Sequence, residues 1–379
     1  MSVTLQNVTR TVDGIPTIRD VSLTLERGTL SVLLGPTLSG KTSIMRLLAG
    51  LDKPTTGRVL VDGKDVTGAD VRQRSVAMVY QQFINYPSLT VYENIASPLR
   101  VQGKPRAEIE RRGAEAAGLL RPEACREGTH VQPLRRQHEA HAQAAAPGRG
   151  AHPVSAHHAH ANPQPERPQR GAATLPRIFE ASGAIFVYAT TEPSEALLLG
   201  GDTVCMWQGQ ALQTGATPKV YRHPDTLRVA QVFSDPPLNI IGIEKKGAQV
   251  IYAGGEQAPA AGLYANLPDG RYRTGFRAHQ LEVGNVAAGR HKFSAAVTVT
   301  EITGSESFVH VHVHGSNWVA VLHGVHEYEP GQVLDAALDP DNIFVFDAAD
   351  RLVASPATSF SGNVHRSARA ANASAGNGK

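Results

Sequence analysis

The chain has 379 residues, enough for two or three domains that each bury a hydrophobic core. A formal net charge of +3 is small for this length, so we expect neither a nucleic-acid partner nor a polybasic membrane anchor. Two cysteines, Cys125 and Cys205, are too few for a disulfide framework or a zinc site and favour a reducing interior. No secretory signal pattern opens the chain, and no apolar run approaches the roughly 18 residues of a membrane span. Any membrane role is therefore expected to come through a partner.

Short strands are predicted over residues 2–34. Val3, Leu5 and Val8 are expected to begin an edge strand, and Asp13-Gly14 is a turn signal. Residues 21–25 alternate apolar with polar side chains, and Leu30-Ser31-Val32-Leu33-Leu34 predicts a buried strand.

The next segment fits the phosphate-loop pattern G-x-x-x-x-G-K-[ST]; it reads Gly35-Pro36-Thr37-Leu38-Ser39-Gly40-Lys41-Thr42. A helix is predicted from Ser43, with Ile44, Leu47 and Leu48 on one stripe and a stop at Gly50. The glycines let backbone N–H groups turn toward an anion, and the start of a helix adds the positive end of its dipole. We expect Lys41 at the β- and γ-phosphates and the Thr42 hydroxyl on Mg²⁺. The alternative is a chance glycine-rich turn, but the flanking strand and helix favour a nucleotide site over residues 35–43.

A hairpin over residues 57–66 and a buried strand over residues 76–80 follow, and the strand runs into Gln81-Gln82-Phe83 and Tyr86-Pro87-Ser88-Leu89-Thr90. The order of these pieces resembles the ATP-binding subunit of an ABC importer of the carbohydrate type that serves maltose and glycerol phosphate. Residues 35–42 match the Walker A loop of that family, and residues 79–81 and 86–90 match its Q-loop.

This resemblance implies an α/β P-loop NTPase fold, an ABC-type nucleotide-binding domain, with ATP and Mg²⁺ as cofactors. It places Gln81 on Mg²⁺ and on the attacking water; for Gln81 taken alone a polar strand end would be favoured, but its company with the Walker A loop reverses that preference. It also implies two partners: a second nucleotide-binding subunit, identical or different, and membrane permease subunits that dock near residues 86–90. The chain would then act in the cytoplasm, peripheral to the membrane. In the family an aromatic residue stacks on adenine where this chain has Val12, which predicts a loss of about 1 kcal/mol of nucleotide affinity.

Residues 122–174 have a different composition. From Gly128 to Thr174 the chain lacks Ile, Phe, Tyr, Trp, Met, Lys, Asp and Cys, while Ala, His, Arg, Pro and Gln are abundant. No apolar periodicity is present, so the segment is expected to be disordered. A proline-rich insertion is one explanation. Metal capture by Ala156-His157-His158-Ala159-His160 is another, but no carboxylate or thiolate accompanies these imidazoles.

A third hypothesis is that this segment is the second half of the nucleotide-binding domain translated in a shifted frame. The distance from Gln81 to the next strand is about what the resembled family needs. Where that family has Leu-Ser-Gly-Gly-Gln, this chain has Leu134-Arg135-Arg136-Gln137. Glycine codons GGC-GGC preceded by C become CGG-CGG, two arginines, when read one base early. As written, the chain has no Walker B aspartate, no adjacent glutamate as general base and no signature loop.

The pattern of a folded domain resumes near Leu175. Residues 185–190 predict a strand, and Thr191-Glu192-Pro193 predicts a helix start with Thr191 as a cap-like residue. By resemblance this is the switch-histidine segment, yet the position expected to be histidine is Thr191. Threonine lacks the reach and charge of that histidine, so no catalytic residue is identified. The Thr-Thr-Glu-Pro sequence resembles a subgroup associated with uptake of glycerol or other polyols.

A strand, turn, strand unit is predicted over residues 202–212, a final helix over 218–224 and a boundary at Ser234-Asp235-Pro236-Pro237. The predicted nucleotide-binding domain is thus 1–235. Short strands with Gly, Asp and Pro between them predict an all-β domain over 236–360, ending on Phe344-Val345-Phe346-Asp347, and 361–379 is expected to be a disordered tail. Residues 275–281 and 299–306 resemble the regulatory domain of these subunits, which is built of OB-like barrels. Three histidines alternate with valines over 309–314, where a solvated strand face is favoured over a metal face.

Two functions remain after this survey. The first is an ATP-binding subunit that energises import of a carbohydrate or polyol, with hydrolysis impaired as written. The second is a degenerate nucleotide-binding partner that does not hydrolyse ATP, or a non-functional product of a frame-shifted gene.

Overall fold

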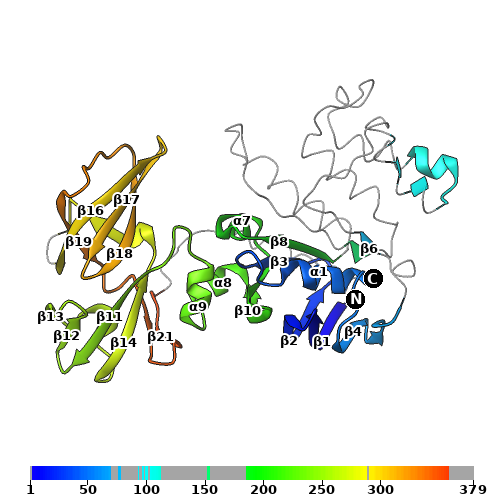
Figure 1. Cartoon of the computed structure of the whole chain (residues 1–379), viewed down its shortest axis with the longest axis horizontal. Helices are drawn as coiled ribbons and strands as arrows, with labels where there is room; N and C mark the ends of the chain where they lie inside the picture. Colours follow the sequence, from blue (N-terminus) through cyan, green and yellow to red (C-terminus); the bar gives the residue numbers. More distant parts are fainter. Residues whose placement is uncertain are drawn as a thin grey trace, which may run out of the picture.

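The computed structural model describes residues 2–69, 76–77, 93, 96–97, 99–100, 103–111, 152–153, 185–287 and 290–357. Four of the five described sheets make up the two halves of the molecule: two surround the phosphate loop and two form the C-terminal β region (Figure 1). A two-stranded parallel pair, β6 (Val76–Ala77) with β7 (His152–Pro153), completes the sheets.

The first sheet is antiparallel, in the order β2-β1-β4-β5. Its strands are β1 (Ser2–Val12), β2 (Ile15–Glu26), β4 (Thr56–Val61) and β5 (Lys64–Asp65). The hairpin turn at Asp13-Gly14 and the 57–66 hairpin are confirmed. The prediction of an edge strand at the N-terminus is wrong, because the later hairpin returns and β4 pairs with the free side of β1.

The second sheet, in the order β10-β9-β3-β8, holds the phosphate loop. Its centre is β3 (Leu30–Leu34), which runs parallel to β8 (Phe186–Thr190) and β9 (Asp202–Trp207); β10 (Gln210–Ala216) closes one edge. All five residues of β3 are buried, as its continuous apolar run predicts for a strand covered on both faces. Helix α1 (Lys41–Ala49) follows the loop and ends at Gly50, whose φ of 75° is left-handed.

Three short helices pack beside this sheet: α7 (Pro193–Leu199), α8 (Thr217–Arg222) and α9 (Leu227–Val232). The prediction that residues 218–224 form the final helix is wrong, because α9 follows α8. Six residues are too few to show a helical stripe, and α9 is marked mainly by Thr226, whose hydroxyl caps the Val229 N–H at 3.3 Å. Thr191 is not the cap of α7 either; Glu192 occupies that position without a side-chain bond.

The C-terminal β region consists of two antiparallel sheets packed on each other. One has the order β13-β12-β11-β14-β20-β21 and the other β15-β19-β16-β17-β18. The strands of the first are β11 (Asn239–Lys246), β12 (Gln249–Tyr252), β13 (Gln257–Pro259), β14 (Gly270–Phe276), β20 (Phe344–Phe346) and β21 (Leu352–Ala354). Those of the second are β15 (Leu281–Val283), β16 (Lys292–Ile302), β17 (Glu306–Val313), β18 (Ser316–His323) and β19 (Val333–Leu338). The strand at 344–347 was expected to be the last, but β21 follows and pairs with β20.

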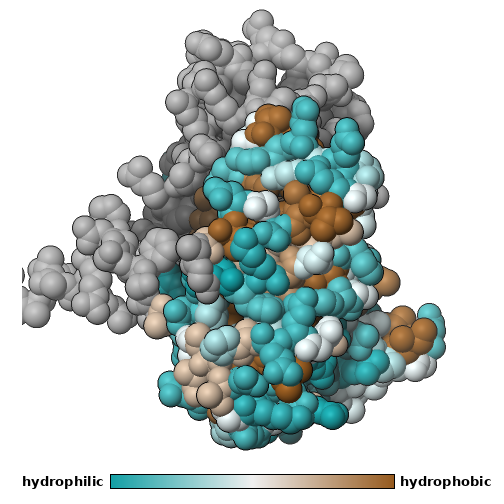
Figure 2. Space-filling model, turned by 90° about the vertical axis from the view of Figure 1, so that its left-hand side faces the viewer, coloured by the Kyte–Doolittle hydropathy of each residue, from teal (hydrophilic) through white to brown (hydrophobic). Residues whose placement is uncertain are grey.

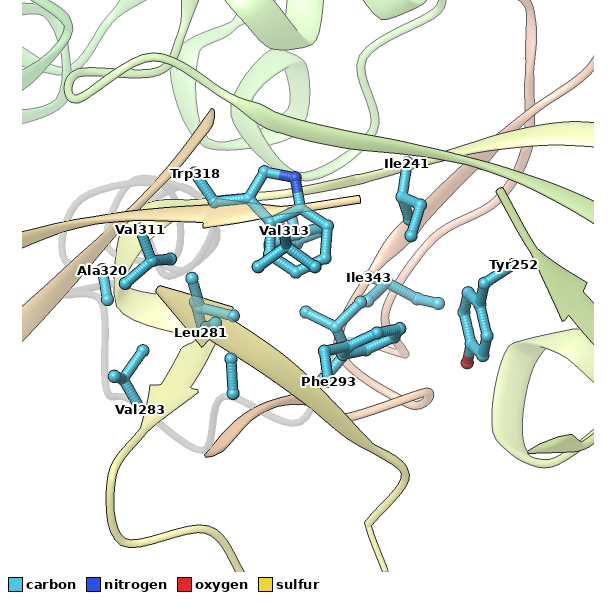
Figure 3. Close-up of a cluster of buried hydrophobic side chains, with 14 of the residues drawn as sticks. Ile241, Tyr252, Leu281, Val283, Phe293, Val311, Val313, Trp318, Ala320 and Ile343 are labelled. Carbon is cyan, nitrogen blue, oxygen red and sulfur yellow. The ribbon is translucent and has the colours of Figure 1, made fainter. Parts of the chain in front are cut away.

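Aromatic and branched side chains from both sheets fill the space between them (Figure 3). The rings of Phe276 and Phe293 lie edge-on to Trp318, with centroids 5.0 and 5.5 Å away. In β17 the valines at 309, 311 and 313 are buried and His310 and His312 lie on the other face, as the alternation predicted. Among the described residues, no three His, Cys, Asp or Glu side chains are grouped to hold a metal ion. On the face in Figure 2, apolar side chains form separate patches within a largely hydrophilic surface.

Helix α9 joins the two halves of the molecule (Figure 1). Its Leu227 and Ala230 pack in one buried cluster with Leu238, Phe344 and Phe346. Next to this cluster, the guanidinium of the buried Arg277 lies 3.6 Å from the centroid of the Tyr221 ring of α8 and donates to the Tyr221 carbonyl at 2.7 Å.

Several earlier expectations fall outside the described residues. These are Gln81, residues 86–90, the segment 122–174 apart from β7, and the tail from 361. Within the described ranges, every helix is too short or too polar to cross a bilayer.

Candidate functional site: the phosphate loop

Two backbone hydrogen bonds fix the phosphate loop to its surroundings, and a third closes a turn within it. The Gly35 N–H donates to the Thr190 carbonyl at 3.3 Å, and the Ser39 N–H donates to the Pro36 carbonyl at 3.2 Å. The Ser39 carbonyl accepts from the Gly209 N–H at 2.9 Å. The loop is therefore held by β8 on one side and by the β9–β10 turn on the other.

Both glycines of the pattern occupy positions that no other residue fills without displacement. Gly40 has a φ of 101°, and a Cβ there would lie 2.9 Å from both Ile18 Cδ1 and the Thr17 carbonyl oxygen. A Cβ on Gly35 would collide with the Met206 carbonyl oxygen. The curl of the loop thus depends on glycine at these two positions.

Lys41 lies beneath the loop with 2% of its surface exposed. Its Nζ donates to the carbonyls of Gly35 at 2.6 Å and Pro36 at 2.8 Å, and it lies 3.4 Å from Ser39 Oγ. Burial lowers the pKa of the Lys41 ammonium to about 8. A cation so placed stabilises an anion that enters the loop, and an anion there would in turn raise the pKa of Lys41.

The start of α1 offers backbone donors to the same anion. Gly40 is its N-cap, and no side-chain oxygen of that residue caps the helix, so the first turn presents its backbone N–H groups toward the loop. These donors, together with Lys41 and the two glycines, fit a phosphate group. Thr42 is exposed and Ser43 half-buried on the first turn, where a hydroxyl can reach a phosphate-bound cation.

Leu38 is a feature of the loop that sequence reasoning did not single out. It has a φ of 66°, in the left-handed region that favours glycine, and it is 95% exposed. Pro36 and Thr37 beside it are also exposed. The outer rim of the loop is therefore exposed, with Pro36 and Leu38 as its apolar side chains.

The turn after β8 is held by a carboxylate that the sequence pattern did not reveal. Glu195 Oε2 accepts from the hydroxyls of Tyr188 at 2.9 Å and Thr190 at 2.7 Å. The Thr190 hydroxyl in turn accepts from the Glu192 N–H at 2.9 Å. Since Thr190 also bonds to Gly35, this network sets the position of Thr191 relative to the phosphate loop.

Thr191 and Pro36 line a common cavity of about 350 Å³. The cavity is bounded by the phosphate loop, the β8–α7 turn, the end of β9, and α9 with the residues after it; its other lining residues are Glu192, Pro193, Trp207, Arg228, Gln231, Val232, Ser234 and Asp235. The structure thus brings the predicted switch position next to the predicted phosphate loop.

Comparison with known proteins identifies the family. Residues 18–158 match the ABC transporter family, and residues 275–346 match the TOBE domain. An sn-glycerol-3-phosphate import ATP-binding protein of Rhizobium johnstonii is 30% identical over 327 residues, which are 85% of this chain and 89% of the relative. The chain belongs to the family of ABC transporter ATP-binding proteins.

Two further relatives align with this ABC protein over nearly their whole lengths. A second sn-glycerol-3-phosphate import ATP-binding protein, from Rhizobium meliloti, is 30% identical over 92% of this chain and 99% of its own. The trehalose/maltose import ATP-binding protein of Thermococcus litoralis is 28% identical over 91% and 97%. The P-loop NTPase fold followed by an all-β domain is confirmed, and the phosphate loop lies within the matched ABC region.

Proposed function

We propose that this ABC protein binds Mg·ATP at residues 35–43 and energises the import of a carbohydrate or polyol. The observation that carries the proposal is Lys41, which is buried beneath a two-glycine loop at the uncapped start of α1. That arrangement offers a cation and backbone donors to one anion. The relatives named for import of glycerol phosphate and of trehalose or maltose support this class of solute.

Thr42 and Gln81 are the proposed Mg²⁺ ligands, and Gln81 is also the proposed contact of the attacking water. A second nucleotide-binding subunit and membrane permease subunits complete the proposed assembly, and they hold the protein at the cytoplasmic face of the membrane. Residues 1–235 form the proposed nucleotide-binding domain and residues 236–360 the proposed regulatory domain. Support for this division comes from the separate ABC transporter and TOBE matches.

Hydrolysis is proposed to be impaired in the chain as written. Thr191 stands where the family has a histidine, and Leu134-Arg135-Arg136-Gln137 stands where it has a glycine-rich signature. The same residues support a second function. In it, the chain binds ATP without hydrolysing it and works beside a partner subunit that has the complete set of catalytic residues.

Binding and turnover of radiolabelled ATP by the full chain test these proposals together, with Lys41→Ala as the control. We expect ATP to bind, the variant to lose that binding, and neither protein to release phosphate. Turnover abolished by Lys41→Ala would show that hydrolysis is intact. Absence of ATP binding would overturn the nucleotide site itself.

The coding DNA across codons 120–175 decides the frame hypothesis, which fails if neither alternative frame encodes a signature and an apolar strand ending in Asp-Glu.

A further inference from the structure

The cavity between the phosphate loop and α9 contains one cationic side chain among its lining residues, Arg228. Arg228 lies on α9, and the cavity reaches from there to Pro36 of the loop and to Thr191. The phosphate loop and this arginine come from distant parts of the sequence and share one space only in the folded chain.

The Arg228 guanidinium stacks on the indole of Trp207, with its central carbon 4.3 Å from the ring centroid. It forms no ion pair with any described residue, in contrast to Arg10 and Arg46, which both pair with Asp52 at 2.6 Å. Stacking on one face of the guanidinium leaves its N–H edge available to an oxyanion. Arg228 is thus a positioned cation that forms no ion pair with a described carboxylate.

The other charged groups of the cavity oppose an anion, so a phosphate there requires a cation to offset them. Glu192 and Asp235 line the same space, and both repel a phosphate. Thr191, at the place of the family's histidine, brings no charge to offset them. Without Arg228 a triphosphate that extends past Pro36 would meet only carboxylates and neutral side chains.

We propose that Arg228 contacts the terminal phosphate of the bound nucleoside triphosphate and makes the site prefer triphosphate over diphosphate. This inference rests on the proposed nucleotide site and adds a residue to it. Trp207 serves as the platform that holds the guanidinium in position, and α9 carries the contact to the β region through its packing on Phe344 and Phe346.

Equilibrium binding of ATP and of ADP to the full chain tests the proposal. Arg228→Ala is expected to weaken ATP binding by about tenfold and ADP binding by less than about twofold, since a charge-assisted contact to the terminal phosphate is lost. Arg228→Met keeps a stem that packs on Trp207 without the charge, and we expect the same loss. Arg228→Lys keeps the charge and is expected to retain most of the preference for ATP. Arg271→Ala, at an exposed arginine of β14, is the matched control and should change neither affinity.

Three results would overturn the proposal: equal loss of ATP and ADP affinity, no loss, or normal binding by Arg228→Met when Arg228→Ala is weakened. The last result would mean that packing on Trp207, and not charge, is what matters. Failure of the nucleotide site is a separate outcome, because then the unmodified chain binds neither nucleotide and Lys41→Ala has no effect. Circular dichroism of each variant excludes misfolding as the cause.

Discussion

The two halves of this molecule differ in how far apart in sequence their paired strands lie. In the β region most neighbouring strands are also neighbours in sequence, as in β11–β12, β16–β17 and β17–β18. Around the phosphate loop, β3 instead pairs with β8 and β9, which lie on the far side of residues 70–184. Local pairing has a low loop-closure cost, whereas the proposed nucleotide site depends on distant segments that must meet. The β region is therefore expected to be the more robust unit, and the nucleotide site the more sensitive one.

The contact between the halves passes through α8 and α9. The Leu227 N–H donates to the Asp350 carbonyl at 2.9 Å, and the Leu352 N–H donates to the Asp225 carbonyl at 3.1 Å. The buried Arg277 adds its stack on Tyr221, and burial lowers the pKa of its guanidinium to about 10. The two halves are thus joined by backbone hydrogen bonds and a cation–aromatic stack at α8 and α9.

The largest effect is expected from Trp318→Ala, which separates the two halves most sharply. Trp318 is 1% exposed in the core shown in Figure 3, and its truncation should cost about 3–5 kcal/mol of unfolding free energy. Calorimetry should show a lowered transition for the β region, while ATP binding at low temperature persists. Ile15→Ala, at the exposed tip of the first hairpin, is the control and should stay within about 0.5 kcal/mol. Loss of ATP binding in Trp318→Ala would mean that the halves fold as one unit.

Gly40→Ala is the reciprocal change in the other half. Alanine at a φ of 101°, with Ile18 and Thr17 in contact, should cost about 2 kcal/mol and lower ATP affinity by about tenfold or more. Gly63→Ala also places alanine at a positive φ, of 76°, but with open space around it. This control should cost about 1 kcal/mol and leave ATP binding unchanged. Equal ATP affinities in the two variants would argue against a tight loop.

The pH dependence of ATP binding should report Lys41. Its pKa of about 8 lies below the ordinary 10.5, so the unfolded chain holds this proton more tightly and the contribution to stability rises between about pH 8 and 10.5. ATP binding recharges Lys41 by proton uptake, and affinity should therefore fall by up to about tenfold per pH unit above pH 8. Titration calorimetry in buffers of different ionisation enthalpy measures the uptake. Lys41→Arg, which stays charged, should abolish the slope; a flat profile in the unmodified protein would place Lys41 away from the phosphates.

Glu195→Gln should have the smallest effect, about 1 kcal/mol, because an amide oxygen accepts less strongly than a carboxylate from Tyr188 and Thr190. Urea unfolding measures this loss. Glu329→Gln, at an exposed loop glutamate, is the control and should be neutral. If the two variants unfold alike, the Glu195 network does not hold the switch turn.

Local patterns were sufficient to predict β3, the phosphate loop and α1, because the strand, the glycines and the apolar stripe lie within one short stretch. Local patterns did not predict the elements whose formation depends on tertiary contacts. Helix α9 and strand β21 are too short to carry a period, and each is stabilised by contact with the other half of the chain. Thr191 was predicted as the cap of α7, but Glu192 takes that position, next to the hydrogen bonds that join Thr190, Glu192 and Glu195.

The candidate site likewise has a part that the sequence predicts and a part that depends on tertiary contacts. Residues 35–43 were predicted from sequence, and the structure gives a physical reason for Gly35, Gly40 and Lys41. The participation of Arg228 and Trp207 was not predictable, because α9 and β9 reach the cavity only through the long-range pairing of β3. Gln81 stays a prediction from the family resemblance.

Hydrogen exchange of the full chain with and without Mg·ATP tests the central claim most directly, because it reports the loop amides and the β region in one experiment. We predict slowed exchange of the backbone amides over residues 35–43 on addition of ATP, and no such protection in Lys41→Ala. The amides of β16–β18 serve as an internal reference and should exchange at the same rate throughout. Unchanged exchange over residues 35–43, or equal protection in the variant, would contradict the assignment of this loop as the triphosphate site.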